Sequence, residues 1–360
     1  MAARFPIVSL TPETFEKIAM LLDPPDLFEL AQGSEQSHDL VKNTMKKLEK
    51  TLIVDFSLFR GISSVRIFLN ARMLFDWKFC NKRNSMRFEL EDLEPRIFNG
   101  ISESEAPIVF YRKSQVQYES VYTCTEDILK IAQYLADLFD LPVKNLYFES
   151  HHLDYLDSIL SCNMIKKDQL QFVNIAEAVV SHSELLQILE GFGDRALHIY
   201  EINTQRGFVY DEMITRRNLK VNFSTWFTGA MLMNLDCEYA DLAIYNVENE
   251  DVNNLLLHIM NSSSHKLKTL AIFKERHLPN VDVEPDHDDD WEERMFNMDK
   301  ISQGLDEFHE EHAGFDAETQ RRFKTINGTF VNVEIDNNEH QSEIYLWTGL
   351  SDSFSEASYE

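Results

Sequence analysis

A short motif, made of a leucine, any residue and an apolar residue, recurs six times between residues 146 and 272. Successive motif leucines are 24, 27, 22, 23 and 28 residues apart, as subtraction of their numbers shows. This spacing coincides with the period of leucine-rich repeats, about 20 to 29 residues, in which each repeat contributes one strand. Chance recurrence of a common residue is the alternative. The copies are Leu146-Tyr147-Phe148, Leu170-Gln171-Phe172, Leu197-His198-Ile199, Leu219-Lys220-Val221, Leu242-Ala243-Ile244 and Leu270-Ala271-Ile272.

Most intervals between the copies also contain a helix pattern, with apolar residues three or four positions apart. Ser181 and Glu184 have the spacing of a capping box and predict the start of one of these helices. A single strand and helix cannot bury their own apolar face, so we expect the units to stack into a solenoid. The asparagine of a standard leucine-rich repeat is absent, so the repeats are degenerate. The helix patterns are Leu153, Leu156, Ile159, Leu160; Leu185, Leu186, Ile188, Leu189; and Val252, Leu255, Leu256, Ile259.

The N-terminal residues predict three short helices on a small core. Thr11 is a good N-cap, and Pro12 suits the first turn of a helix. The segment 23–25, Asp-Pro-Pro, ends this helix and starts the next, and Gly33 with Ser34 ends the second. The apolar stripes are Phe15, Ile18, Ala19, Leu22 in the first helix, Leu27, Phe28, Leu30, Ala31 in the second, and Leu40, Val41, Met45, Leu48 in the third.

The region between the helices and the repeats is rich in β-branched and aromatic residues. The segments 51–59 and 64–79 predict strands, and the more polar residues 81–107 predict turns with a short strand. A helix is expected from Thr123 onward, with Glu126 at capping-box spacing. These patterns divide the chain into a helical unit at 1–48, a strand-rich connecting region at 49–122, a repeat-like domain at 123–349 and a disordered acidic tail at 350–360.

The charge and the cysteines limit the classes of partner and compartment. The 34 Lys and Arg against 61 Asp and Glu give a net charge of −27, which disfavours a nucleic-acid partner. No apolar run has the roughly 18 residues that a membrane span needs, and the opening MAARFPIVSL lacks the core of a signal peptide. The four widely spaced cysteines form no CxxC pair. We therefore expect a soluble cytoplasmic or nuclear protein with no membrane partner.

Catalytic and metal-binding patterns are weak. The acidic residues 282–293 surround His287, but their spacing fits no EF-hand, so a solvated loop is favoured over a metal site. His309 and His312 do not match HExxH, and GxGxxG, Walker and GxSxG motifs are absent. A thiol dyad built on Cys124 or Cys162 has no local signature. We expect no catalytic residue, no metal and no cofactor.

The N-terminal stretch resembles the F-box in the form common in nematodes. A second segment, 225–261, together with FKTINGTFVNVEI and IYLWTG, is similar to the type 2 F-box-associated domain of nematode F-box proteins. The F-box matches are Phe5, Pro6, Leu10, Ile18, Leu27, Phe28, Leu30, Ser34, Val41 and Lys42. The matches in the associated domain are Trp226, Leu232, Leu235, Asp236, Cys237, Leu242, Asp251, Val252, Asn253, Leu256, His258, Asn327, Gly328 and Trp347.

The repeat spacing and the F-box resemblance together predict an α/β chain in which a three-helix F-box precedes a degenerate leucine-rich-repeat-like strand-helix solenoid. It also implies a non-enzymatic substrate receptor of an SCF-type cullin-RING ubiquitin ligase, which binds a Skp-type adaptor, and through it a cullin, with the F-box and a protein target with the C-terminal domain. Trp226 and Phe227 are weak candidates for target contact, with core packing as the favoured alternative. The alternative function is a repeat-based interaction scaffold unrelated to ubiquitination, with the N-terminal helices as a cap. The adaptor-binding candidates are Phe5, Pro6, Leu10, Pro12, Phe15, Ile18, Leu22, Leu27 and Leu30.

Overall fold

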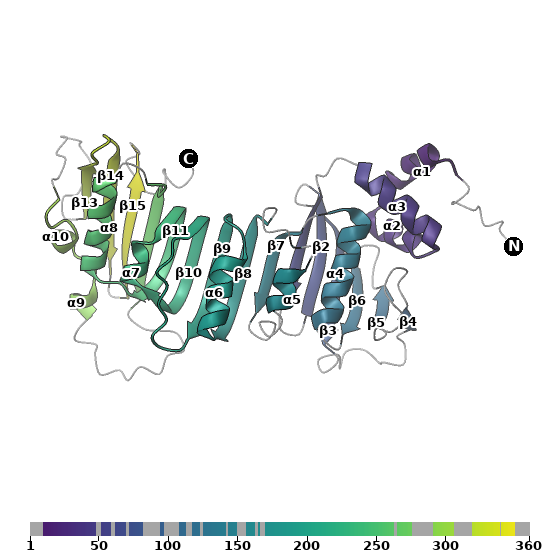
Figure 1. The fold of residues 1–360 in the computed structure, drawn as a ribbon, viewed down its shortest axis with the longest axis horizontal. Helices are drawn as coiled ribbons and strands as arrows, with labels where there is room; N and C mark the ends of the chain where they lie inside the picture. The colour runs from purple at the N-terminus through teal and green to yellow at the C-terminus, as the bar shows by residue number, and fades with distance from the viewer. Residues whose placement is uncertain are drawn as a thin grey trace. The chain divides into compact units, whose positions relative to one another are not determined.

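The computed structural model of the chain describes residues 10–47, 52–58, 62–69, 72–81, 94–96, 108–112, 117–122, 125–141, 143–149, 156–162, 165, 170–262, 265–275, 291–305, 319–338 and 340–349. The fold is mixed α/β, as the sequence predicts, and the chain divides into two units (Figure 1). Unit 1 is residues 1–173 and unit 2 is residues 174–360. The division falls inside the region 123–349 that the sequence assigns to one repeat-like domain.

Unit 1 begins with three helices and continues into a sheet. Its strands lie in the order β7-β1-β2-β3-β6-β5-β4, with β1 parallel to β7, β3 parallel to β6, and the other pairs antiparallel. The elements are α1 (Pro12–Ala19), α2 (Pro24–Ala31), α3 (Glu35–Lys47), β1 (Leu52–Leu58), β2 (Ile62–Leu69), β3 (Arg72–Asn81), β4 (Glu94–Arg96), β5 (Ile108–Arg112), β6 (Gln117–Tyr122), α4 (Thr125–Phe139), β7 (Val143–Glu149) and α5 (Leu156–Ser161).

The three N-terminal helices form where proline and the caps predict them. Thr11 is the N-cap of α1, and its hydroxyl accepts a hydrogen bond from the Thr14 amide at 3.4 Å. Phe15 and Phe28 are fully buried, so α1 and α2 each place one aromatic ring in the core. The predicted strand 51–59 corresponds to β1, and the segment 64–79 contains parts of two strands, β2 and β3, which pair antiparallel.

Unit 2 has a sheet whose strands follow the chain order from β8 to β12. The full order is β8-β9-β10-β11-β12-β15-β14-β13. The neighbours from β9 to β12 are parallel, whereas the pairs β12–β15, β15–β14 and β14–β13 are antiparallel. The elements are β8 (Phe172–Val180), α6 (His182–Gly191), β9 (Ala196–Thr204), β10 (Ile214–Thr228), α7 (Gly229–Leu232), β11 (Leu235–Asn246), α8 (Asn249–Asn261), β12 (Thr269–Glu275), α9 (Trp291–Arg294), α10 (Met298–Ile301), β13 (Gln320–Lys324), β14 (Phe330–Asn337) and β15 (Gln341–Thr348).

The recurring motif marks the strands of unit 2, but the copy at Leu242 lies two residues out of register with the copies on both neighbouring strands. Leu197 pairs with Leu219, and Leu219 pairs with Ala240 rather than with Leu242. Because the shift is two residues, the apolar side chains stay on the same face of the sheet. The buried rows that result are Leu197, Leu219, Ala240, Leu270, Leu346, Val333 and Ile199, Val221, Leu242, Ile272, Ile344, Ile335.

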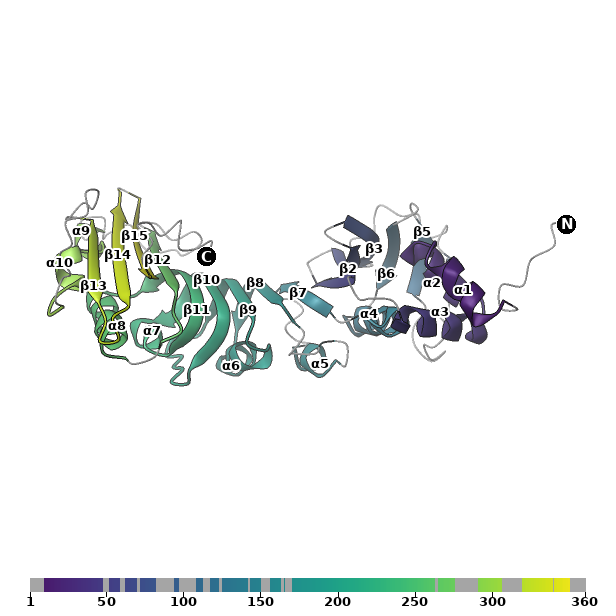
Figure 2. The same cartoon turned by 90° about the horizontal axis from the view of Figure 1, so that it is seen from above.

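Helices α6, α7 and α8 lie on one side of the sheet (Figure 2). Because these helices cover that side, the buried rows are assigned to it. The three helix patterns predicted between the motif copies correspond to α5, α6 and α8, and the interval between β10 and β11 contains the short helix α7. Between β9 and β10 the chain makes no helix but a loop, in which Gly207 has φ 87° and Phe208 and Tyr210 are buried. Both rings therefore belong to the core of unit 2. Within the described residues, no helix is long and apolar enough to cross a membrane.

Candidate functional site

An exposed apolar pair follows helix α1 in the N-terminal helical unit. Met20 is 61% exposed and Leu21 is 85% exposed, although both are large apolar side chains. Phe15 and Ala19 face the core, and each further helical residue turns about 100° around the axis, so residues 20 and 21 leave the buried side. The turn is fixed, because the Leu21 amide donates to the Ile18 carbonyl oxygen at 2.9 Å before Pro24 starts α2. An exposed pair on a fixed turn suits a protein partner.

The adaptor-binding residues predicted from the sequence divide between core and surface. Phe15 is fully buried and Leu27 is 3% exposed, so both belong to the helical core. Pro12 is exposed, whereas Leu10, Ile18, Leu22 and Leu30 are half-buried. Phe5 and Pro6 lie outside the described residues.

The sequence prediction missed Met20 and Leu21. Their signal is the run 18–22, Ile-Ala-Met-Leu-Leu, because five successive apolar residues cannot all face one side of a helix. An uninterrupted apolar run in a helix therefore predicts that some of its side chains lie outside the core.

Contacts with the rest of unit 1 hold the three helices in place. The Phe28 ring meets the Trp77 ring of β3 edge to face at a centroid distance of 5.2 Å. The Gln32 side-chain amide donates to the Tyr134 hydroxyl of α4 at 2.5 Å. Burial raises the pKa of Tyr134 to about 12, although this hydrogen bond acts in the opposite direction. The phenol is therefore neutral at physiological pH and available as the acceptor.

Trp226 and Phe227, the weak candidates for target contact, are core residues. Trp226 is 3% exposed and Phe227 is fully buried. The Trp226 ring packs edge to face on Phe208 at 5.9 Å and lies 5.7 Å from the ring of Phe227. Neither ring offers an exposed surface to a partner.

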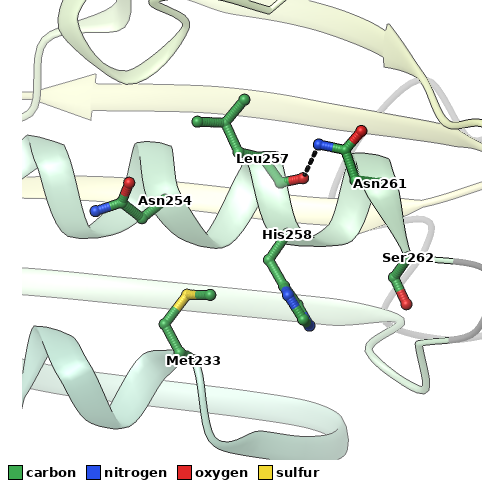
Figure 3. A pocket seen from close by; sticks show the side chains of 6 residues that line it. All are labelled: Met233, Asn254, Leu257, His258, Asn261 and Ser262. Carbon is green, nitrogen blue, oxygen red and sulfur yellow. Dashed lines mark hydrogen bonds between the residues drawn. The ribbon is translucent and has the colours of Figure 1, made fainter.

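A shallow pocket of about 570 Å³ lies along α8 of unit 2 (Figure 3). Its lining residues offer amides, apolar groups, one hydroxyl and one imidazole, and none of them carries a carboxylate or a thiol. The Asn261 side-chain amide is already used, because it donates to the Leu257 carbonyl oxygen at 2.8 Å. The lining residues are Met233, Asn254, Leu257, His258, Asn261 and Ser262.

The described residues contain no group of three or more His, Cys, Asp and Glu side chains that could hold a metal ion. The acidic segment up to residue 290, with His287, lies outside the described residues, as do His309, His312 and Cys124. Cys162 and Cys237 are free thiols. Burial raises the pKa of Cys237 to about 12, so this side chain is a thiol rather than a nucleophilic thiolate at physiological pH.

Comparison with known proteins adds no assignment. No protein-family model, no curated protein and no solved structure matches this chain. The exposed apolar pair of the helical unit and the sheet of unit 2 are therefore the features on which a function can be argued.

Proposed function

We propose that the protein is a substrate-recognition subunit of an SCF-type cullin-RING ubiquitin ligase. Its N-terminal helices act as an F-box that binds a Skp-type adaptor, and unit 2 holds a protein target. The protein itself performs no chemistry in this role. It keeps the target close to a ubiquitin-charged enzyme, so that transfer becomes effectively intramolecular.

The exposed pair Met20 and Leu21 carries the proposal. Two adjacent apolar side chains with 61% and 85% of their surface exposed are costly for an isolated domain and suit a permanent partner. Ile18 and Leu22, which lie on either side of the pair in the sequence, are half-buried and add apolar surface to this end of α1. A helical unit that keeps its aromatic rings inside and these aliphatic chains outside has the division expected of an adaptor-binding module.

The order of the strands supports a repeat-like target-binding unit. Strands β8 to β12 are neighbours in the order of the chain, as stacking of successive repeats requires. Side chains also join neighbouring strands at their ends. The Thr225 hydroxyl donates to the Asn203 side-chain oxygen at 3.1 Å, and the Asn246 side-chain amide donates to the Thr225 carbonyl oxygen at 2.7 Å. These side chains join neighbouring strands, and in this they resemble the asparagine of a standard leucine-rich repeat, which the motif lacks.

Adaptor capture tests the proposal directly. The double variant Met20→Asp with Leu21→Asp should lose at least about 90% of the captured Skp-type adaptor, because two charges replace the centre of an apolar contact. The control changes Val209→Asp and Met213→Asp, two apolar residues of unit 2 that are 69% and 53% exposed, and should capture as much adaptor as the native chain. A native chain that captures no adaptor, or a double variant that captures as much, contradicts the proposal.

The alternative is a repeat-based interaction scaffold in which the N-terminal helices only cap unit 1. The contact between Phe28 and Trp77 favours it, since a cap must cover core side chains of the sheet. Deletion of residues 1–42 would uncover Trp77, so both functions predict loss of solubility. The two functions differ in the effect expected of the double variant. If the helices act only as a cap, partner binding does not depend on Met20 and Leu21.

A further inference from the structure

The sheet of unit 2 has a second face, opposite to the buried rows and to α6, α7 and α8 (Figure 2). Successive residues of a strand point to opposite faces, so the residues that follow each buried row in the direction of β9 form two rows on this second face. The pairing of the strands defines them, and we call them the acidic rows. They are His198, Lys220, Asp241, Ala271, Tyr345, Glu334 and Tyr200, Asn222, Ala243, Phe273, Glu343, Asp336.

The acidic rows carry an excess of negative charge. Four of their residues are carboxylates, and Lys220 is their single Lys or Arg, with its ammonium group 2.5 Å from Asp241. Unit 2 as a whole has 36 Asp and Glu against 14 Lys and Arg, which gives −22 of the chain's −27. A surface of this charge repels nucleic acid and attracts cationic groups.

Glu343 is a buried carboxylate without a cation. It is 7% exposed, and among the described residues it forms no ion pair. The Tyr345 hydroxyl and the Gln341 side-chain amide donate to it. Burial and the charges of Asp336 and Asp241 raise the pKa of this carboxyl. Since a buried charge without a counter-ion costs free energy, a cation that reached Glu343 would bind favourably.

Aromatic rings lie beside this carboxylate. Phe273 is the direct strand partner of Glu343, and its ring meets that of Tyr345 edge to face at 5.9 Å. The Tyr245 hydroxyl, two residues along β11 from Ala243, has no hydrogen-bond partner within the described part of the chain. Guanidinium and ammonium groups donate hydrogen bonds and bind over aromatic rings, so the rows offer both kinds of contact.

We propose that the acidic rows bind an arginine- or lysine-bearing segment of a partner protein, with Glu343 as the anchoring ion-pair partner. This deepens the proposed function, because the partner would be the target. It specifies the target by chemistry, as a protein with an exposed basic segment. Adaptor capture through Met20 and Leu21 is measured separately, so the two proposals can fail independently.

The test uses the full chain and a fluorescein-labelled peptide of alternating arginine and glycine, followed by fluorescence anisotropy at low salt. Glu343→Gln should weaken binding at least about tenfold, since the neutral amide cannot form the ion pair with the peptide. Asp336→Asn, an exposed change in the same row, should weaken binding by a smaller factor. The matched control Glu190→Gln removes one exposed carboxylate on α6 and should bind as the native chain does.

Three results overturn the inference. They are absence of binding to the arginine peptide, equal weakening by Glu343→Gln and Glu190→Gln, and equally tight binding of a matched glutamate peptide. Unfolding of Glu343→Gln is checked by its melting temperature, and Asp336→Asn tests the same row without a buried change. Adaptor capture by Glu343→Gln should equal that of the native chain, whereas the Met20 and Leu21 double variant should still bind the peptide.

Discussion

At the scale of single residues, His198 in the acidic rows links folding to pH. Burial is the main cause that lowers its pKa to about 4, Lys220 acts in the same direction and Asp241 opposes both. The ordinary value of 6.5 applies to the unfolded chain, so between pH 6.5 and pH 4 the unfolded state binds more protons than the folded state. Stability from this residue is therefore complete above pH 6.5 and falls as the pH falls toward 4.

We expect His198→Gln to reduce the loss of stability on acidification. After allowance for solvent screening, the native chain should lose about 1 to 2 kcal/mol more than the variant between about pH 7 and about pH 5. Urea unfolding midpoints of both proteins at the two pH values measure the difference. Equal losses in the two proteins would show that His198 titrates normally in the folded state.

At the scale of elements, α7 and α8 of unit 2 meet through a glycine. A Cβ atom at Gly229 would lie 1.9 to 2.1 Å from the carboxylate atoms of Asp251. Asp251 accepts a hydrogen bond from the Glu248 amide at 2.8 Å and so caps α8. An alanine at 229 would force this carboxylate to turn away and leave the amide without its cap.

Gly229→Ala should therefore lower the free energy of unfolding by about 1 to 2 kcal/mol. Combination with Asp251→Ala should cost less than the sum of the two single changes, because the clash and the cap share one carboxylate. Glu250→Ala, an exposed change in the same helical turn, should add independently to Gly229→Ala. Urea unfolding of the three single and two double variants measures the coupling, and strict additivity with Asp251→Ala would contradict this packing.

The sequence predicted elements where the determinants are local. Ser181 and Glu184 form the expected capping box, with the Ser181 amide donating to Glu184 at 2.7 Å. The cap of α8 was not predicted, because glutamate is a poor N-cap and Glu248 with Asp251 does not match the usual pattern. The two-residue shift at Leu242 was also missed, since a motif gives the face of a strand but not its register.

Contacts between distant segments could not be predicted from local sequence patterns. Asn249 donates to the Met295 carbonyl oxygen and accepts from the Asn297 amide, and so attaches the segment of α9 and α10 to α8. Lys274 is 1% exposed and donates to the Arg294 carbonyl oxygen at 3.0 Å. A lysine in a strand pattern predicts an exposed side chain, so this burial depends on a partner that spacing cannot reveal.

For the whole molecule, the two units differ most in charge. Unit 1 has 25 Asp and Glu against 20 Lys and Arg, a net of −5, while unit 2 has a net of −22. The candidate sites differ accordingly. The apolar pair Met20 and Leu21 lies in the nearly neutral unit and suits an apolar partner, whereas the acidic rows lie in the strongly charged unit and suit a cationic one. Salt should thus affect the two binding events differently.

The charge of unit 2 also predicts how salt changes stability. Raising sodium chloride from about 0.01 M to about 0.15 M shortens the Debye length from about 30 Å to about 8 Å. Repulsion among the excess carboxylates then weakens, so the melting temperature should rise by about 2 to 4 °C for each 1 kcal/mol gained. Ion pairs such as Lys266 with Asp236 at 2.5 Å act in the opposite direction, but exposed pairs contribute only about 0 to 1 kcal/mol each.

Calorimetry across this salt range decides which effect is larger. A fall in the melting temperature would mean that the ion pairs outweigh the net repulsion.

Binding of the arginine peptide should weaken over the same range, because salt screens attraction between opposite charges. Adaptor capture through Met20 and Leu21 should change little, since apolar contacts are nearly independent of moderate salt. Opposite responses of folding and peptide binding, measured on one protein, would tie both to the charge of unit 2.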